Sequence, residues 1–184
     1  MKLKDTRIRI SVRSLVYLLR SSVLIATAAA SFPALAQAQW FNQSWGGAFD
    51  GKPNQVAGVE SGDYGFALRC TGPVDLVALY ITAQSTEDFD FDALNDLGPQ
   101  VLVRVDEDAP LSLSAVLQDI NGYVRAEASA PPELLTQVIS AKSRIALALQ
   151  LDGQLYHEKH FNVVRSTVVG NKLAASCGLK LADQ

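Results

Sequence analysis

Alternating side chains along residues 65–81 predict two neighbouring strands around which the rest of the chain is arranged. Every second residue from Phe66 to Cys70 is apolar and Ala or Arg stands between, so one face of the first strand is expected to be buried. Residues 74–81 are apolar apart from one aspartate, which is typical of a strand covered on both faces. The turn Thr71-Gly72-Pro73 separates the two strands.

Six further runs of this kind predict strands over residues 55–60, 101–105, 111–118, 123–128, 144–151 and 154–163. Two pairs of these runs flank Asn121-Gly122 and Asp152-Gly153. Both dipeptides suit the tight turns in which the two central residues take a positive φ. We therefore expect a hairpin at each of these two dipeptides.

Helical spacing of apolar residues occurs twice in the second half of the chain. Pro131-Pro132-Glu133 begins one helix, which runs through Ser140, because proline is tolerated in the first turn. Ser166 is expected to cap a second helix over residues 168–176, and Gly178 to end it. The acidic stretch 85–98 predicts a loop with one helical turn at 92–97.

Together these elements predict one mainly β domain over residues 39–184. It is expected to be either β-sandwich-like or a curled antiparallel sheet of about eight strands, with two short helices. The lead-in, residues 39–53, is rich in glycine and aromatic residues and is expected to be irregular. Its Trp40 and Trp45 either plug one end of the core, as large aromatic residues usually do, or form an exposed binding patch.

Residues 1–38 have the pattern of a secretory signal peptide. Six basic residues precede an uncharged, alanine-rich run over residues 21–38. Cleavage after Ala38 fits the small-x-small rule and leaves Gln39 as the first residue; cleavage after Ala36 fits it as well. The alternative is a retained anchor, but these 18 residues are poorer in large apolar side chains than a typical membrane span, so we expect none after cleavage.

The remainder of the chain is acidic. Residues 1–38 hold six of the 16 Lys and Arg residues and one of the 19 Asp and Glu residues. Residues 39–184 therefore hold 10 basic and 18 acidic residues, which gives them a net charge of −8. An acidic surface repels phosphate groups. We therefore expect neither nucleic acid nor an anionic membrane as a partner.

Cys70 and Cys177 are the two cysteines of the chain. Export would place them in an oxidising compartment, the periplasm or the outside of the cell, where such a pair most often forms a disulfide; the alternative is two free thiols. Cys70 shares a face with Phe66, and Cys177 lies on the apolar stripe of the last helix, four residues after Leu173. Both sulfurs are thus expected to face the core, with Cα atoms within about 4.4–6.8 Å.

His157 and His160 are the two histidines, and their spacing argues against a shared metal ion. A zinc-protease helix needs two histidines four residues apart on one helical face. These two are three apart in a predicted strand, so their side chains should point to opposite faces of the sheet.

Asp88, Asp90 and Asp92 have the spacing of the first ligands of a calcium loop. The sixth and twelfth positions of that loop require glycine and glutamate, but here they hold Ala93 and Pro99. We expect these aspartates to lie in water. The sequence also contains no nucleophile elbow, phosphate loop or dinucleotide fingerprint, so no catalytic residue, metal or cofactor is predicted.

The layout of the chain resembles that of two groups of small exported bacterial proteins, the invasion-associated locus B group and the periplasmic accessory proteins of type VI secretion. The matching features are the aromatic lead-in, a strand that ends in cysteine, and a strand, helix and closing cysteine near the C-terminus. They are carried by Trp40, Trp45, Leu68-Arg69-Cys70, Phe161, Ser166, Leu173 and Cys177. The resemblance implies a β-sandwich-like periplasmic or secreted protein without known enzymatic activity.

Two functions from different classes remain open from the sequence. The first is a non-enzymatic exported accessory or interaction protein with a protein partner in the bacterial envelope. The alternative is a small envelope hydrolase or ligand carrier with a site between two sheets. A deep pocket with convergent polar groups would favour the alternative, and a filled core would favour the first.

Overall fold

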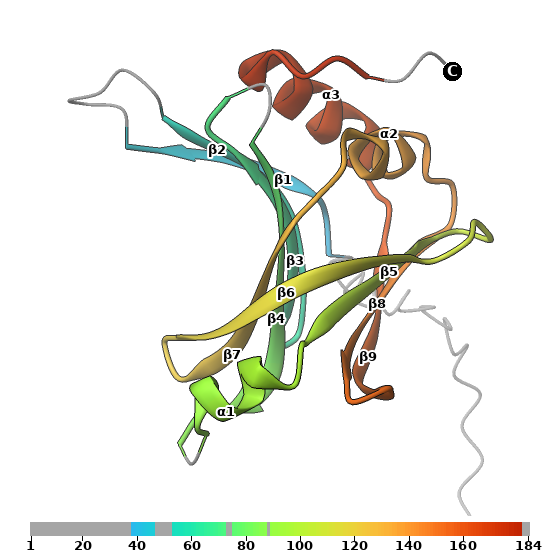
Figure 1. Ribbon diagram of the computed structural model, residues 1–184. Coiled ribbons are helices and arrows are strands. Elements are labelled where there is room, and N and C mark those ends of the chain that lie inside the picture. The colour runs from blue at the N-terminus through green and yellow to red at the C-terminus, as the bar shows by residue number, and fades with distance from the viewer. Residues whose placement is uncertain (1–37, 47–52, 73–74, 88, 182–184) are drawn as a thin grey trace, which may run out of the picture. The chain divides into compact units, whose positions relative to one another are not determined.

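The computed structural model describes residues 38–46, 53–72, 75–87 and 89–181, which form nine strands and three helices (Figure 1). The strands are β1 (Phe41–Trp45), β2 (Asn54–Ser61), β3 (Tyr64–Cys70), β4 (Leu76–Ser85), β5 (Gln100–Val105), β6 (Leu111–Ile120), β7 (Tyr123–Ser129), β8 (Arg144–Leu151) and β9 (Gln154–Asn162). The helices are α1 (Phe91–Asp96), α2 (Pro132–Ser140) and α3 (Ser166–Cys177). The predicted signal peptide lies outside the described residues except for Ala38.

All nine strands join one antiparallel sheet in the order β1-β2-β3-β4-β7-β6-β5-β8-β9. The sheet curls into a half-barrel, so that strands far apart in this order approach each other across its concave face (Figure 1). The predicted mainly β class and the curled antiparallel sheet are therefore confirmed. The sheet is continuous, so of the two predicted architectures the sandwich of facing sheets is not the one formed.

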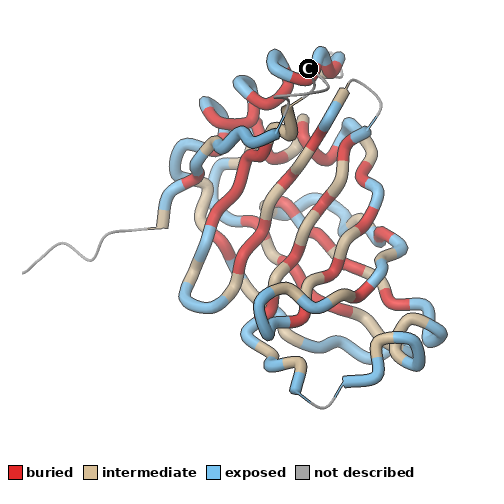
Figure 2. The backbone as a smooth tube through the Cα atoms, turned by 90° about the vertical axis from the view of Figure 1, so that its left-hand side faces the viewer, coloured by how far each residue is buried: buried red, intermediate tan, exposed pale blue. Residues whose placement is uncertain are grey.

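The concave face of the half-barrel carries the core, and burial alternates along the strands, as Figure 2 shows. In β3, Phe66 and Leu68 are at most 1% exposed, while Arg69 beside them on the convex face is half-buried. In β4, Tyr80 is fully buried and Leu79 is half-buried. The predicted coverage of β4 on both faces is thus only partial, because no element of the described residues packs over the convex face here.

Both predicted hairpin turns are formed. Asn121 and Gly122 have φ values of 53° and 84°, and Asp152 and Gly153 have values of 48° and 75°. Positive φ at both central residues gives a turn whose twist matches that of the flanking strands. These turns join β6 to β7 and β8 to β9.

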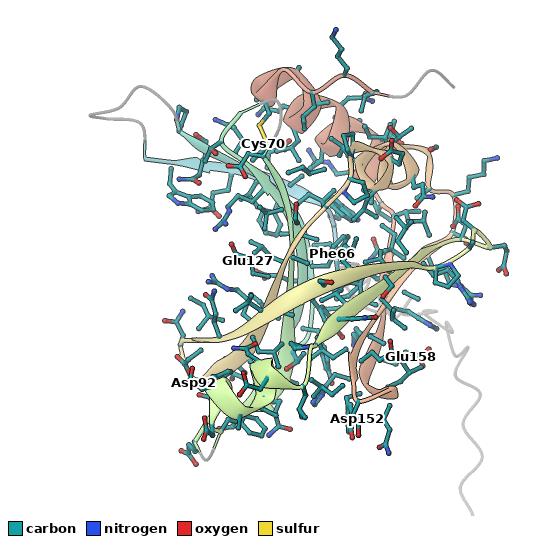
Figure 3. All side chains as sticks on the ribbon, in the orientation of Figure 1. Phe66, Cys70, Asp92, Glu127, Asp152 and Glu158 are labelled. Atoms are coloured by element: carbon teal, nitrogen blue, oxygen red, sulfur yellow. A yellow bond between two sulfur atoms is a disulfide. The ribbon has the colours of Figure 1, made fainter. Side chains whose placement is uncertain are left out.

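Helices α2 and α3 pack against each other and cover the end of the half-barrel where Cys70 lies (Figures 1 and 3). Cys70 and Cys177 form a disulfide there, with Cα atoms 6.3 Å apart, within the predicted range. The helices cross closely at Gly170, where an added Cβ would lie 2.6 Å from Cγ1 of Ile139. The bridge and this crossing together hold α3 across the end of the sheet.

The start of α3 differs from its prediction. The cap position is Arg165, which has a φ of 72° and makes no side-chain cap hydrogen bond. Ser166 is instead the first residue of the helix; it is fully buried, and its Oγ has no hydrogen-bond partner among the described residues. Packing turns this side chain inward, so the predicted serine cap is wrong. The chain before the helix is fixed by Asn162, whose Oδ1 accepts a hydrogen bond from the Val164 amide at 3.0 Å.

The aromatic lead-in is also more regular than predicted, because part of it forms β1 along the edge of the sheet. Trp40 is fully buried; its ring packs edge-on against Phe66, and its Nε1 donates a hydrogen bond to the Asn162 carbonyl at 2.9 Å. Trp45 is 44% exposed. Of the two roles left open by the sequence, Trp40 therefore takes the core and Trp45 the surface.

Candidate functional site

The two ends of the half-barrel are filled differently. Beneath α2 and α3 the interior is closed by large, fully buried side chains, among them Trp40 and Leu134. At the opposite end, beneath α1, a cavity of about 510 Å³ remains, which we call the α1 pocket. This volume lies within the range of roughly 300–1,000 Å³ that is typical of small-molecule sites.

The walls of the α1 pocket are mainly apolar and its rim is polar. The apolar lining residues are Phe89, Leu94, Leu97, Leu117, Val124, Leu149 and Leu151. The polar lining residues are Gln84, Asp152, Gln154, Tyr156 and His157. They come from α1 and its preceding loop and from β4, β6, β7, β8 and β9, so that the curl of the sheet brings together segments far apart in the sequence.

Asn95 holds α1 over the pocket. Its Nδ2 donates to the Leu117 carbonyl at 3.0 Å, and its Oδ1 accepts from the Leu117 amide at 2.7 Å. These two bonds take the place of hydrogen bonds from a neighbouring strand, because β6 pairs with β5 only up to Ser114. The helix itself is capped by Asp90, whose carboxylate accepts from the Ala93 amide at 3.1 Å.

The apolar side chains near α1 line a space instead of filling it. No residue of α1 is fully buried. Phe89 remains 40% exposed and Leu97 53% exposed, although both line the pocket. Exposed large apolar side chains that converge on one concave site mark a binding surface more often than isolated ones do.

His157 enters the pocket wall through a β-bulge. Leu147 pairs with Lys159 and Leu149 pairs with Tyr156, so the register of β8 and β9 shifts between these pairs. His157 has a φ of 53° within this shift. A bulge bends its strand and changes where a side chain points, and such features recur next to functional sites.

The surroundings of His157 fix its protonation state. Burial lowers the pKa of its imidazole, so that the ring is neutral at neutral pH. Burial also raises the pKa of Tyr80, first of its causes, so the phenol stays protonated and donates to the His157 carbonyl. The Tyr64 ring lies 6.5 Å from the imidazole. The described residues make no hydrogen bond or ion pair to the imidazole nitrogens.

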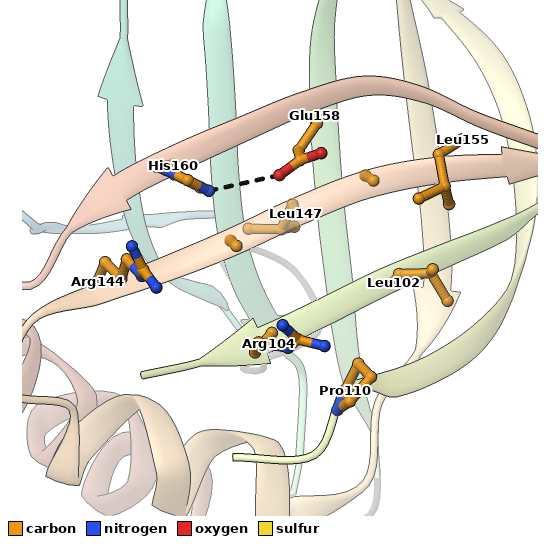
Figure 4. Close-up of a pocket in the computed structure, with 10 residues that line it drawn as sticks. Leu102, Arg104, Pro110, Arg144, Leu147, Leu155, Glu158 and His160 are labelled. Atoms are coloured by element: carbon orange, nitrogen blue, oxygen red, sulfur yellow. Dashed lines mark ion pairs between the residues drawn. The ribbon is translucent and has the colours of Figure 1, made fainter. Parts of the chain in front are cut away.

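A second hollow, the outer trough, lies on the convex face of β5, β8 and β9 and has a volume of about 390 Å³ (Figure 4). Ala146 and Ala148 of β8 line it, and β8 lies between β5 and β9, which contribute longer side chains such as Arg104 and Glu158. His160 pairs with Glu158 at 3.5 Å on one flank, while Arg144 pairs with Glu107 at 3.2 Å. Exposed pairs of this kind contribute little to stability.

The two histidines occupy different hollows, as their spacing predicts: His157 lines the α1 pocket and His160 lines the outer trough. Asp90 caps α1 and Asp92 lies in its first turn, while Asp88 is outside the described residues. Within the described ranges, no three His, Cys, Asp or Glu side chains gather as metal ligands do.

Asp106 has a role that sequence reasoning missed. Its carboxylate accepts hydrogen bonds from the amides of Lys142, Ser143 and Arg144 at 2.7, 2.8 and 3.0 Å, and from the Ser143 hydroxyl at 2.7 Å. These bonds, led by that of the Arg144 amide, hold the pKa of Asp106 well below its usual range. The residue is therefore a structural tie between the β5–β6 turn and the segment before β8. The sequence gives no local signal for it, because the partners lie 36 to 38 residues away.

The α1 pocket was likewise not predicted residue by residue. A signal that could have pointed to it is the acidic stretch 85–98, whose Phe89, Leu94 and Leu97 have no strand-like alternation to bury them. Over the described part of the chain, no helix is long and apolar enough to cross a membrane. No family model, no curated protein and no solved structure matches this chain.

Proposed function

We propose that this chain is an exported, non-enzymatic accessory protein of the bacterial envelope that works by binding a small, largely apolar molecule in the α1 pocket. The observation that carries the proposal is the cavity itself, about 510 Å³ in volume with seven apolar residues in its walls. Walls of this kind suit retention of a molecule, and a few polar groups at the rim suit its orientation.

The proposal joins the accessory role expected from the sequence with its alternative, a ligand carrier. In place of a site between two sheets, the ligand would lie at the mouth of one curled sheet. The partly exposed side chains of Phe89 and Leu97 support this, because a ligand would cover apolar surface that the fold leaves in contact with water.

The proposed location is the periplasm or the outside of the cell. The signal-like pattern of residues 1–38 supports it, and so does the Cys70–Cys177 disulfide, since such bonds persist in oxidising compartments. The layout shared with invasion-associated locus B proteins and with type VI secretion accessory proteins supports a protein partner in the envelope. N-terminal sequencing of the envelope-fraction protein tests export; Gln39 is expected first, and an intact Met1 on membrane-bound protein would contradict the proposal.

Binding is tested with N-phenylnaphthylamine, a neutral dye that fluoresces in apolar sites, added to the protein purified from the envelope fraction. We expect saturable fluorescence that Leu97→Arg weakens by about tenfold, because a charged side chain enters the apolar wall. The matched control is Val168→Arg: Val168 is 65% exposed on α3, at the opposite end of the half-barrel. An absence of saturable binding, or equal loss in both variants, would contradict the proposal.

A further inference from the structure

The charged side chains that line the α1 pocket, or belong to α1 and its cap, are all acidic. Asp152 lines the pocket from the β8–β9 turn, Asp92 and Asp96 lie on α1, and Asp90 caps that helix. Figure 3 shows Asp92 and Asp152 at the same end of the half-barrel, away from Cys70. None of the pocket's described lining residues is a lysine or arginine. The potential at the mouth is therefore negative, which attracts cations and repels anions.

Aromatic rings stand at the same rim. Tyr156 is 42% exposed and Phe89 is 40% exposed, and both line the pocket. The Tyr156 hydroxyl donates to Gln154 Oε1 at 3.0 Å. The face of an aromatic ring is electronegative and attracts ammonium groups, above all when carboxylates stand nearby.

Deeper in the pocket the lining is aliphatic. Leu117, Val124 and Leu149 are at most 4% exposed and project from the concave face of the sheet. A site with this order of surfaces, aliphatic below and acidic and aromatic above, has the polarity of an amphiphile whose head group is positive.

We propose that the α1 pocket binds an amphiphilic cation, whose aliphatic or aryl body enters the pocket and whose amine or quaternary ammonium head stays between Asp152, Tyr156 and Phe89 at the rim. This inference rests on the proposed function and adds to it the charge of the ligand.

Two other groups on the same wall bear on this assignment. Lys159 lies two residues beyond His157, but its Nζ stands over the Tyr64 ring, 5.1 Å from the centroid, and does not line the pocket. The His157 imidazole is neutral at neutral pH, because burial lowers its pKa. Neither group therefore offers a positive charge to an anionic head.

Three amphiphiles with the same dodecyl chain test the inference. Each is used below its micelle concentration to displace N-phenylnaphthylamine from the protein purified from the envelope fraction. We expect dodecyltrimethylammonium to displace the dye at a concentration about tenfold lower than dodecanoate, with dodecyl maltoside between them. The gap should narrow between about 20 mM and about 500 mM salt, because exposed charges are screened. Dodecanoate equal to or better than the cation would overturn the inference and leave the proposed function intact. Failure of the dye and of all three amphiphiles to bind would overturn both.

Asp152→Asn locates the head group. Asparagine-glycine is the preferred dipeptide of such a turn, so this variant keeps the fold and loses only the charge. We expect the preference for the cation to fall by about threefold. Asp108→Asn removes the same charge from the exposed turn after β5, at the end of β5 and β8 away from Asp152, and should leave the preference unchanged. Equal effects of the two variants would overturn the placement of the head at the β8–β9 turn.

Tyr156→Leu tests the aromatic contribution. It should weaken binding of dodecyltrimethylammonium more than binding of dodecyl maltoside, and equal weakening of both would overturn that contribution.

Discussion

Asp106 connects distant segments of the chain through a single carboxylate. It stands in a turn with a φ of 49°, a value that aspartate and asparagine adopt more readily than most residues. Three consecutive amides converge on it from the segment that enters β8. Without the carboxylate these amides would lose their protein partners, so the negative charge stabilises the folded state.

We expect Asp106→Asn to lower the free energy of unfolding at pH 7 by about 1 kcal/mol, since the site is partly solvated. The folded-state pKa of Asp106 is lowered, so its contribution is complete above the usual carboxyl pKa of about 3.9 and is lost as the pH falls below it. Urea unfolding from pH 7 to pH 3 should therefore show the difference between wild type and variant narrowing below about pH 4. Asp108→Asn, in the same turn, is the control and should change neither the free energy of unfolding at pH 7 nor its dependence on pH. A difference that stays constant with pH would contradict this role.

At the scale of residues, the features that could be predicted are those with a local cause. Asn121-Gly122 and Asp152-Gly153 take their φ values from the turn that they form, and both are where the sequence predicts them. Ser166 has the right residue type for a cap, but its environment is decided by the packing of α3, which the local sequence does not contain.

Among the elements, α1 depends most on a single contact. We expect Asn95→Ala to free α1 from β6, because both hydrogen bonds to Leu117 are lost. The free energy of unfolding should fall by about 1–2 kcal/mol, and dye binding in the α1 pocket should weaken. Amide hydrogen exchange measures the local effect: the Leu117 amide should lose protection while the core amides of β3 keep theirs.

Asn95→Asp is the matched variant for this test. It keeps the acceptor for the Leu117 amide and loses the donor to the Leu117 carbonyl, so its effect on exchange should be intermediate. Unchanged protection at Leu117 in Asn95→Ala would show that other contacts hold α1 in place.

At the crossing of α2 and α3, we expect a glycine-to-alanine change to destabilise the protein, although helix propensity alone predicts that it stabilises. Replacing a helical glycine by alanine normally stabilises a protein by about 1 kcal/mol. At Gly170 the new Cβ would lie 2.6 Å from Ile139 Cγ1, so the helices must move apart. We expect Gly170→Ala to lower the free energy of unfolding in urea by about 1–2 kcal/mol net. The exposed Ser176→Ala in the same helix should be neutral or slightly stabilising, and a stabilised Gly170→Ala would contradict this reading of the crossing.

Elements with strong periodicity could be predicted, and those that depend on tertiary contacts could not. The strands of the second half and α2 were predictable because their apolar residues repeat at a clear spacing. β1 was not, because four of its five residues are exposed and no alternation of apolar and polar residues marks it. The bulge at His157, which shapes the α1 pocket, arises from a register shift that neither strand of the hairpin signals by itself.

For the molecule as a whole, the curl of the sheet creates both a closed and an open end. Trp40 and the pair α2 and α3 close one end, while α1 only partly fills the other. The sequence predicted the curled sheet as one of two architectures but not which end would stay open, because that depends on which side chains meet across the concave face. The stability of the closed end and ligand binding at the open end are therefore separable properties.

The Cys70–Cys177 disulfide tests this separation. The two cysteines are 107 residues apart in the sequence, so the bridge restricts most of the unfolded chain. A Cys70→Ser/Cys177→Ser variant should be less stable by about 2–4 kcal/mol, mainly because its unfolded state gains conformational entropy. The fold should survive, since both hairpins pair inside the loop and α3 still buries Val169 and Leu173. Urea unfolding measures the loss of stability, and reductant should reproduce that loss in the wild type and have no effect on the variant.

Dye binding in the α1 pocket should remain within about twofold of the wild type under native conditions, because a stability loss of this size leaves nearly all molecules folded. Two free thiols in the denatured, unreduced wild-type protein would contradict the bridge, and loss of dye binding in a variant that is still folded would show that the two ends are coupled.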